Sequence, residues 1–274
     1  VTALQSELNA KASLDADVTF GTINGMKVTA KKGGANSTFV GDGAGDPPVL
    51  PDVPGAEVTA TGFRAAYRNE GNSVTASGYQ AARDNTGTNV TATGFVAAQN
   101  NTGVNVTASG YQAALSNTGN YVTASGVNAA YLNTGAQATA TGYAAALSNT
   151  GSNVTASGNY AAYQNTGANV TATGVNAAYQ NTGANVTASG VNAARGNTGN
   201  DVTASGFQAA YLNEGIQVIA SGVNAAYQNT GDYVTASGYL AAYQNTGVNV
   251  TASGYQAAYE NGFNQVYDAN GDPT

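Results

Sequence analysis

The sequence predicts an all-β protein built as a parallel β-solenoid, or β-roll, of sixteen-residue coils. The first observation is an internal repeat, because residues 57–264 divide into thirteen consecutive units of sixteen residues without insertion or deletion. The second is a short run of β-forming residues in every unit, and the third is an Asn-Thr-Gly turn signal that closes most units. Sixteen residues are too few for a helix pair or a propeller blade, but they suffice for one coil of a solenoid.

The strand is predicted at the start of each unit. We number the repeat positions 1 to 16 from the first Asn of NVTATGVNAAYQNTGA, residues 169–184. Position 2 is Val except at Ala138, position 3 is Thr except at Ile219, position 4 is always Ala, and position 5 is Ser or Thr. Alternation with a period of two places Val and Ala on one face of a strand and the hydroxyl side chains on the other. Glycine at position 6 ends the strand.

Positions 7 to 12 are predicted to form a second extended stretch. Position 7 is usually aromatic or Val, positions 9 and 10 are always Ala, and positions 8 and 12 are mostly polar. Alanine also favours helices, so a helical alternative has to be weighed. Each unit carries two glycine positions and an Asn-Thr-Gly break, so no stretch reaches the roughly 12 residues that an isolated helix needs.

Asparagine at position 13 is the most regular polar residue of the repeat. Stacked coils turn each position into a ladder of like side chains, and asparagine ladders pass amide hydrogen bonds from one coil to the next. We therefore expect a structural role for this residue rather than a catalytic one. The structural ladder comprises Asn69, Asn85, Asn101, Asn117, Asn133, Asn149, Asn165, Asn181, Asn197, Asn213, Asn229, Asn245 and Asn261.

Aromatic ladders are predicted at positions 7 and 11. The invariant alanines imply a thin core that buries little area, so the aromatic residues hold most of the apolar surface. Position 11 admits Arg83, Gln99 and Arg195, which predicts half exposure, whereas position 7 admits only Asn159 as a polar residue and is expected to be the better buried ladder. An apolar stripe marks an interface, and three-fold closure of identical chains would cover it. The candidate interface comprises Phe63, Tyr79, Phe95, Tyr111, Tyr143, Phe207, Tyr239 and Tyr255.

The flanks of the repeats differ in composition. Val1, Leu4 and Leu8 have heptad-like spacing, Asn24-Gly25 is a hairpin signal, and NSTFVG at 36–41 looks like a degenerate coil. The expected organisation is a short coiled-coil end at 1–16, a β region with the degenerate repeat at 17–45, a Pro-rich spacer at 46–56, the solenoid at 57–264 and an exit segment at 265–274.

Composition excludes several functional classes. Charged residues make up 8% of the chain, against roughly 25% in typical soluble proteins. The chain has no Cys and no His, and the net charge of −7 with only eight Lys and Arg provides no basic stripe for nucleic acid. No apolar run is long enough to span a membrane.

No catalytic, cofactor or metal site is predicted, and we expect that the chain is not an enzyme. Acidic residues are scattered through the repeats rather than paired, and the glycine-rich segment 41–45 lacks the Lys-Ser/Thr of a phosphate-binding loop. Asn-Val-Thr recurs as a formal glycosylation sequon, which strand periodicity explains without any sugar.

The segment VTASGYQAA at 106–114 resembles the V-A-I-G-x-x-A pattern of trimeric autotransporter adhesin heads and the N-T-A-I-G-Y-Q-A repeats of phage tail-fibre proteins. NSTFVGDGA at 36–44 is similar to the second pattern. The resemblance implies a homotrimer of parallel β-rolls in the virion. This would be a structural segment of a tail fibre that spaces or presents receptor-binding elements during host attachment. Its partners would be other tail proteins and a host surface glycan or protein. The bulky Ile before glycine in these families is Ser or Thr here.

Two alternatives remain open. One is the head of a trimeric adhesin on a bacterial cell surface, to which the same resemblance points. The other is an ice-binding solenoid, because positions 3 and 5 form a Thr-x-Ser/Thr array with about 7 Å along the strand and about 4.8 Å between coils. Ile219 interrupts this array, and Ser outnumbers Thr at position 5.

Overall fold

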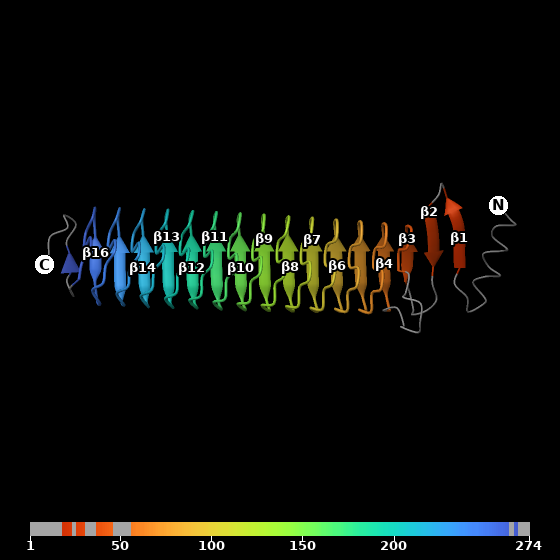
Figure 1. Ribbon diagram of the computed structural model, residues 1–274, viewed down its shortest axis with the longest axis horizontal. Coiled ribbons are helices and arrows are strands. Elements are labelled where there is room, and N and C mark those ends of the chain that lie inside the picture. Colours follow the sequence, from red (N-terminus) through yellow and green to blue (C-terminus); the bar gives the residue numbers. More distant parts are fainter. Residues whose placement is uncertain (1–17, 24–25, 31–36, 46–55, 263–265, 268–274) are drawn as a thin grey trace. The chain divides into compact units, whose positions relative to one another are not determined.

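The main secondary structure of this protein is a series of short parallel strands, one from each coil (Figure 1). The computed structural model describes residues 18–23, 26–30, 37–45, 56–262 and 266–267. None of these residues is helical, so the β-solenoid prediction is confirmed and the helical alternative is wrong. The chain divides into two units, Val1–Ser125 and Gly126–Thr274.

The first unit starts with an antiparallel hairpin and continues as solenoid. β1 (Val18–Ile23) pairs with β2 (Met26–Ala30) through Ile23 and Met26, as the hairpin prediction requires. β2 is antiparallel to β3 (Thr38–Val40), which is parallel to β4 (Val58–Thr61) and lies in the segment predicted to be a degenerate coil. The parallel series continues through β5 (Val74–Ser77), β6 (Val90–Thr93), β7 (Val106–Ser109) and β8 (Val122–Ser125).

The second unit repeats the same arrangement. Its strands are β9 (Ala138–Thr141), β10 (Val154–Ser157), β11 (Val170–Thr173), β12 (Val186–Ser189), β13 (Val202–Ser205), β14 (Val218–Ser221), β15 (Val234–Ser237), β16 (Thr251–Ser253) and β17 (Val266–Tyr267). From β9 to β16, the paired residues of neighbouring strands are sixteen positions apart in the sequence, with no register shift.

The core is a thin layer of small side chains. Val186 and Ala188 point inward from β12, while Ala193 and Ala194 close the coil from the other side, and all four are at most 1% exposed. The outward residues of β12, Thr187 and Ser189, are exposed, as the alternation predicts. Because facing layers of Ala and Val leave a narrow gap, the solenoid has a small hydrophobic cross-section and depends strongly on its hydrogen bonds.

The second extended stretch predicted at positions 7 to 12 is wrong, because these residues form successive turns. In the coil 169–184, Asn176, Ala178 and Gln180 have φ near +50° to +55°. The backbone N–H of Asn176 and that of Gln180 donate to the preceding coil, and that of Ala178 donates to the following coil. A left-handed residue at every second position also produces a period of two, so the sequence pattern resembles that of a strand.

Glycines at positions 6 and 15 allow the coils to approach one another. A Cβ on Gly174 would lie 2.6 Å from the carbonyl oxygen of Gly190, and one on Gly167 would lie 1.9 Å from that of Gly183. Gly174 also has a φ of +126°, which L side chains rarely adopt. Both positions therefore exclude any side chain at the observed coil spacing.

Several predicted segments lie outside the described residues. These are the coiled-coil end at 1–16, nearly all of the Pro-rich spacer at 46–56, the turn residues 24–25, and most of the exit segment at 265–274.

Candidate functional surfaces

The asparagines of position 13 form a hydrogen-bonded ladder inside each unit. Asn181 is fully buried, and its Nδ2 donates to Oδ1 of Asn165 at 2.8 Å and to the carbonyl of Gly183 at 2.7 Å. Its own Oδ1 accepts from Nδ2 of Asn197 at 2.8 Å. Both amide protons and the side-chain oxygen are therefore paired, which removes the cost of burying an amide. These asparagine side chains therefore lie in the interior, where solvent does not reach them.

The outward side chains of the solenoid strands in each unit form a regular array of hydroxyl groups. In unit 2, the position-3 and position-5 side chains of β9 to β16 are all exposed, and all are Thr or Ser apart from Ile219. The same two positions are exposed in β4 to β8 of unit 1. No charged side chain occupies either position in these strands. The face is thus uncharged, periodic and rich in hydrogen-bonding groups.

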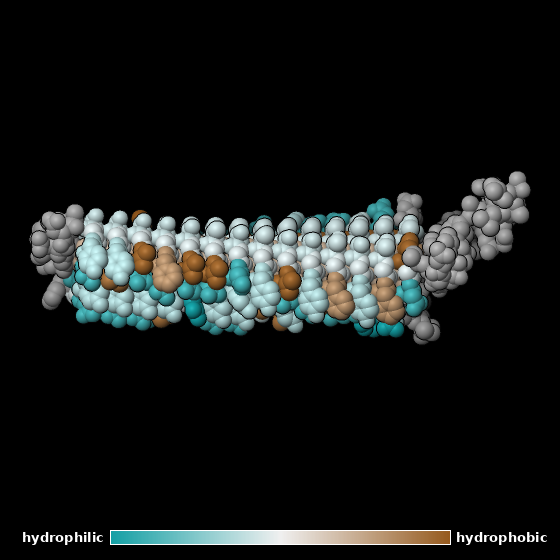
Figure 2. Space-filling model, turned by 90° about the horizontal axis from the view of Figure 1, so that it is seen from above, coloured by the Kyte–Doolittle hydropathy of each residue, from teal (hydrophilic) through white to brown (hydrophobic). Residues whose placement is uncertain are grey.

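The position-7 side chains form an exposed apolar stripe along each unit. Figure 2 shows this stripe as a row of large aromatic and aliphatic side chains. In unit 1, Phe63, Tyr79, Phe95 and Tyr111 stack with ring centroids 4.8–5.2 Å apart and interplanar angles of 5–14°. The prediction that position 7 is better buried than position 11 is wrong, because these four side chains are 37–47% exposed. Position 7 directly follows the glycine corner and points away from the core.

The stripe in unit 2 has a different composition. Its apolar members are 40–65% exposed, and Asn159 is its polar member. Tyr239 and Tyr255 stack at 5.3 Å, whereas Tyr143 meets Tyr160 edge-on. The hydrogen bond with Tyr143 raises the pKa of the Tyr160 phenol above its usual value, and burial adds to this. The apolar members are Val127, Tyr143, Val175, Val191, Phe207, Val223, Tyr239 and Tyr255.

Position 11 forms a second stack, which is half-buried for most of its length. Tyr211, Tyr227, Tyr243 and Tyr259 lie parallel, with centroids 4.9–5.0 Å apart. Arg195 extends this stack, because its guanidinium lies 5.1 Å from the ring of Tyr179 and 5.8 Å from that of Tyr211. The planar cation therefore replaces one aromatic ring without breaking the ladder. Loss of solvent around Tyr227 raises its pKa, and the neighbouring phenols raise it further.

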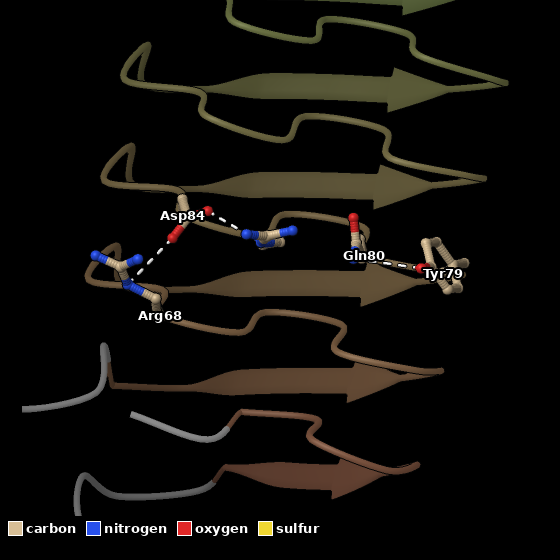
Figure 3. A network of polar contacts seen from close by, with 5 residues as sticks. Arg68, Tyr79, Gln80 and Asp84 are labelled. Atoms are coloured by element: carbon tan, nitrogen blue, oxygen red, sulfur yellow. Dashed lines mark hydrogen bonds and ion pairs between the residues drawn. The ribbon is translucent and has the colours of Figure 1, made fainter. Parts of the chain in front are cut away.

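Charged residues gather in the first two repeats. Asp84 pairs with Nε of Arg68 at 3.3 Å and with Nε of Arg83 at 3.0 Å, and Nε2 of Gln80 lies 3.5 Å from the hydroxyl of Tyr79 (Figure 3). This arrangement holds one carboxylate between two guanidinium groups. Paired catalytic carboxylates would need a second acid at this point, and the network contains none.

The described part of the chain shows few features of metal binding, membrane insertion or acid–base catalysis. It contains no group of three or more potential metal ligands, and no helix there is long and apolar enough to cross a bilayer. A shallow hollow of about 380 Å³ lies beside Gly196, where a missing side chain interrupts position 12. Thr198, Leu212 and Glu214 contribute to its lining, which brings together no set of groups that could perform acid–base chemistry.

Comparison with known proteins gives no relative: no protein-family model matches the chain, and no curated protein or solved structure shows significant similarity to it. The fold therefore defines the class. The chain is a β-solenoid repeat protein whose sixteen-residue coils present a hydroxyl face and an apolar stripe in each unit.

Proposed function

We propose that this chain is a structural fibre segment of a phage tail fibre that spaces or presents receptor-binding elements during host attachment. The observation that carries this proposal is the exposed stripe at position 7. An exposed apolar side chain recurs at position 7 in every repeat except the one with Asn159, so the stripe offers a linear surface rather than a local binding site.

A second copy of the chain is the natural occupant of this stripe. Identical chains running in parallel present identical stripes, and cyclic symmetry allows three such stripes to close around one axis. An aromatic side chain buries about 150–250 Å² in a core. The eight half-exposed aromatic residues of position 7 therefore offer several hundred Å² of surface per chain for burial in an interface. Stable interfaces bury about 800 Å² per partner, so the stripe provides much of what a trimer needs.

The absence of inserted loops from the thirteen repeats supports a mechanical role. The thirteen repeats contain no insertion, and specific recognition usually resides in loops carried by a scaffold. In this proposal the solenoid sets a distance, and other parts of the fibre make the specific contacts.

Mass in solution tests the proposal. We expect light scattering to give three times the mass of one chain. The double variant Val191→Glu/Phe207→Glu places two charges in the stripe and should shift the mass towards a monomer. The control Leu212→Glu/Ile216→Glu changes two exposed apolar residues at positions 12 and 16 and should remain trimeric. A monomeric wild-type chain would contradict the fibre proposal.

Location distinguishes the phage from the bacterial alternative. Gold-labelled antibodies raised against the chain should decorate the tails of virions. Labelling of the surface of uninfected bacteria would instead select the adhesin.

A further inference from the structure

The hydroxyl face has a regularity that a spacer does not require. Each strand from β9 to β16 presents two outward side chains, and fifteen of these sixteen are Thr or Ser. A hydroxyl group has one donor and two acceptor sites, so it can occupy the place of a water molecule in a hydrogen-bonded lattice. Charged groups would hold their own hydration shells, and positions 3 and 5 carry none in these strands.

The face is held rigid from below. The buried Val and Ala of each strand fix its inner side, and the in-register ladder from Val170↔Val186 to Thr173↔Ser189 repeats without a bulge. Glycines at positions 6 and 15 keep neighbouring coils at one spacing, because a Cβ there would collide with the next coil. Threonine adds a β-branched side chain with few χ1 rotamers. The hydroxyl positions therefore need little ordering when they bind a periodic surface.

The spacing of the array is close to that of crystalline water. In ice, tetrahedral water with hydrogen bonds of about 2.75 Å places next-nearest oxygens about 4.5 Å apart, and the layer repeat in the perpendicular direction is about 7.3 Å. Adjacent strands are about 4.8 Å apart, and positions 3 and 5 are about 6.6 Å apart. The mismatch of about 0.3 Å per coil stays within about 1 Å over about three coils on either side of the best-matched strand.

We propose that the hydroxyl face of unit 2 binds the surface of ice. The occupant is a neutral lattice of donors and acceptors, which matches an uncharged face of hydroxyl and methyl groups in both charge and period. A glycan would favour an exposed aromatic platform or a cleft, and this face has neither, since its outward residues are Thr, Ser and Ile219. Many weak contacts formed together make the attachment strong even though each contact contributes little.

Thermal hysteresis of the full chain tests the proposal. We expect ice crystals in its presence to stop growing over a measurable interval below the melting point, and fluorescently labelled chain to be taken up by growing ice. Thr171→Tyr places a bulky side chain on the face at β11 and should lose most of this activity. Thr182→Tyr places the same side chain at exposed position 14 of the same coil and should retain it. Position 14 already accepts the larger residues Glu70 and Glu214.

A variant that is expected to gain activity provides the most specific test. Ile219→Thr restores the missing hydroxyl in β14 and should increase the hysteresis, while circular dichroism confirms that every variant keeps its β structure. Wild-type chain without hysteresis or ice uptake would overturn the proposal. Equal activity in folded Thr171→Tyr, or equal loss in Thr182→Tyr, would overturn it as well. Light scattering on the same samples reports the fibre proposal separately, so either proposal can fail alone.

Discussion

Single buried amides hold neighbouring coils together. Replacing Asn181 by Ala removes the side-chain partner of the Gly183 carbonyl, of Oδ1 of Asn165 and of one N–H of Asn197 Nδ2, whose other N–H stays bonded to Gly199. Each unpaired buried group costs about 1–3 kcal/mol, so we expect a loss of about 3 kcal/mol or more in the free energy of unfolding. Urea denaturation measures this loss. The control Thr182→Ala, at an exposed site, should change stability by less than about 0.5 kcal/mol. Equal effects of the two variants would refute a structural role for the ladder.

Backbone conformation sets a second residue-scale cost. Leu132 has a φ of +55° and is 43% exposed, so its side chain gains little from burial while its backbone occupies the left-handed region. Asparagine tolerates this region far better than leucine does. We expect Leu132→Asn to stabilise the protein by about 1 kcal/mol and to raise the Tm in a calorimetric scan. Leu132→Ala removes the same side chain without the left-handed preference, so it should not stabilise.

At the scale of the coil, glycine determines how closely the elements stack. A Cβ on Gly167 would meet the carbonyl oxygen of Gly183, which belongs to rigid backbone, whereas one on Gly196 would meet only the flexible tip of Leu212. We expect Gly167→Ala to destabilise by about 3 kcal/mol or more through overpacking. Gly196→Ala should cost only about 1 kcal/mol, from its positive φ. Hydrogen exchange should show opening in residues 153–184 for the first variant alone.

The sequence predicts the strand of each coil better than the rest of it. Val186 and Ala188 alternate with Thr187 and Ser189, and this period leaves one choice of buried face once a strand is assumed. Positions 7 to 12 show a similar alternation for another reason, because left-handed residues such as Asn176, Ala178 and Gln180 recur at every second position. Composition alone does not separate the two backbones, since Ala178 gives no sign of its positive φ.

Burial of the aromatic ladders also depends on the direction of the backbone at the glycine corner, which the residue types alone do not reveal. Position 7 is nearly always apolar, which favours burial, yet the glycine corner before Phe63 and Tyr79 turns these side chains outward. Position 11 is half-exposed, as its tolerance of Arg195 predicts, and the guanidinium there also stacks between two rings. Strand alternation predicts the hydroxyl face, whereas the spacing of the asparagines does not indicate that their amides also donate to glycine carbonyls.

On the scale of the whole molecule, few charged groups among the described residues form ion pairs. Asp84 with Arg68 and Arg83 forms the ion pairs seen among the described residues, and all three lie near the start of the repeats. At the alkaline end of the pH range, Tyr227 in the position-11 stack is a group that links ionisation to folding. Burial and the neighbouring phenols of Tyr211 and Tyr243 raise the pKa of Tyr227 in the folded chain.

A raised phenol pKa makes the folded chain sensitive to alkali. An unfolded tyrosine ionises near pH 10, so the contribution of Tyr227 is fully present below about pH 10 and is lost as pH rises through the higher folded pKa. We expect the thermal unfolding midpoint to change little from neutral pH to about pH 9 and then to fall. Tyr227→Phe keeps the stacked ring, so it should match the wild type at pH 7 and lose less stability above pH 10. Equal slopes for the two proteins across the alkaline range would show that the stack does not couple ionisation to folding.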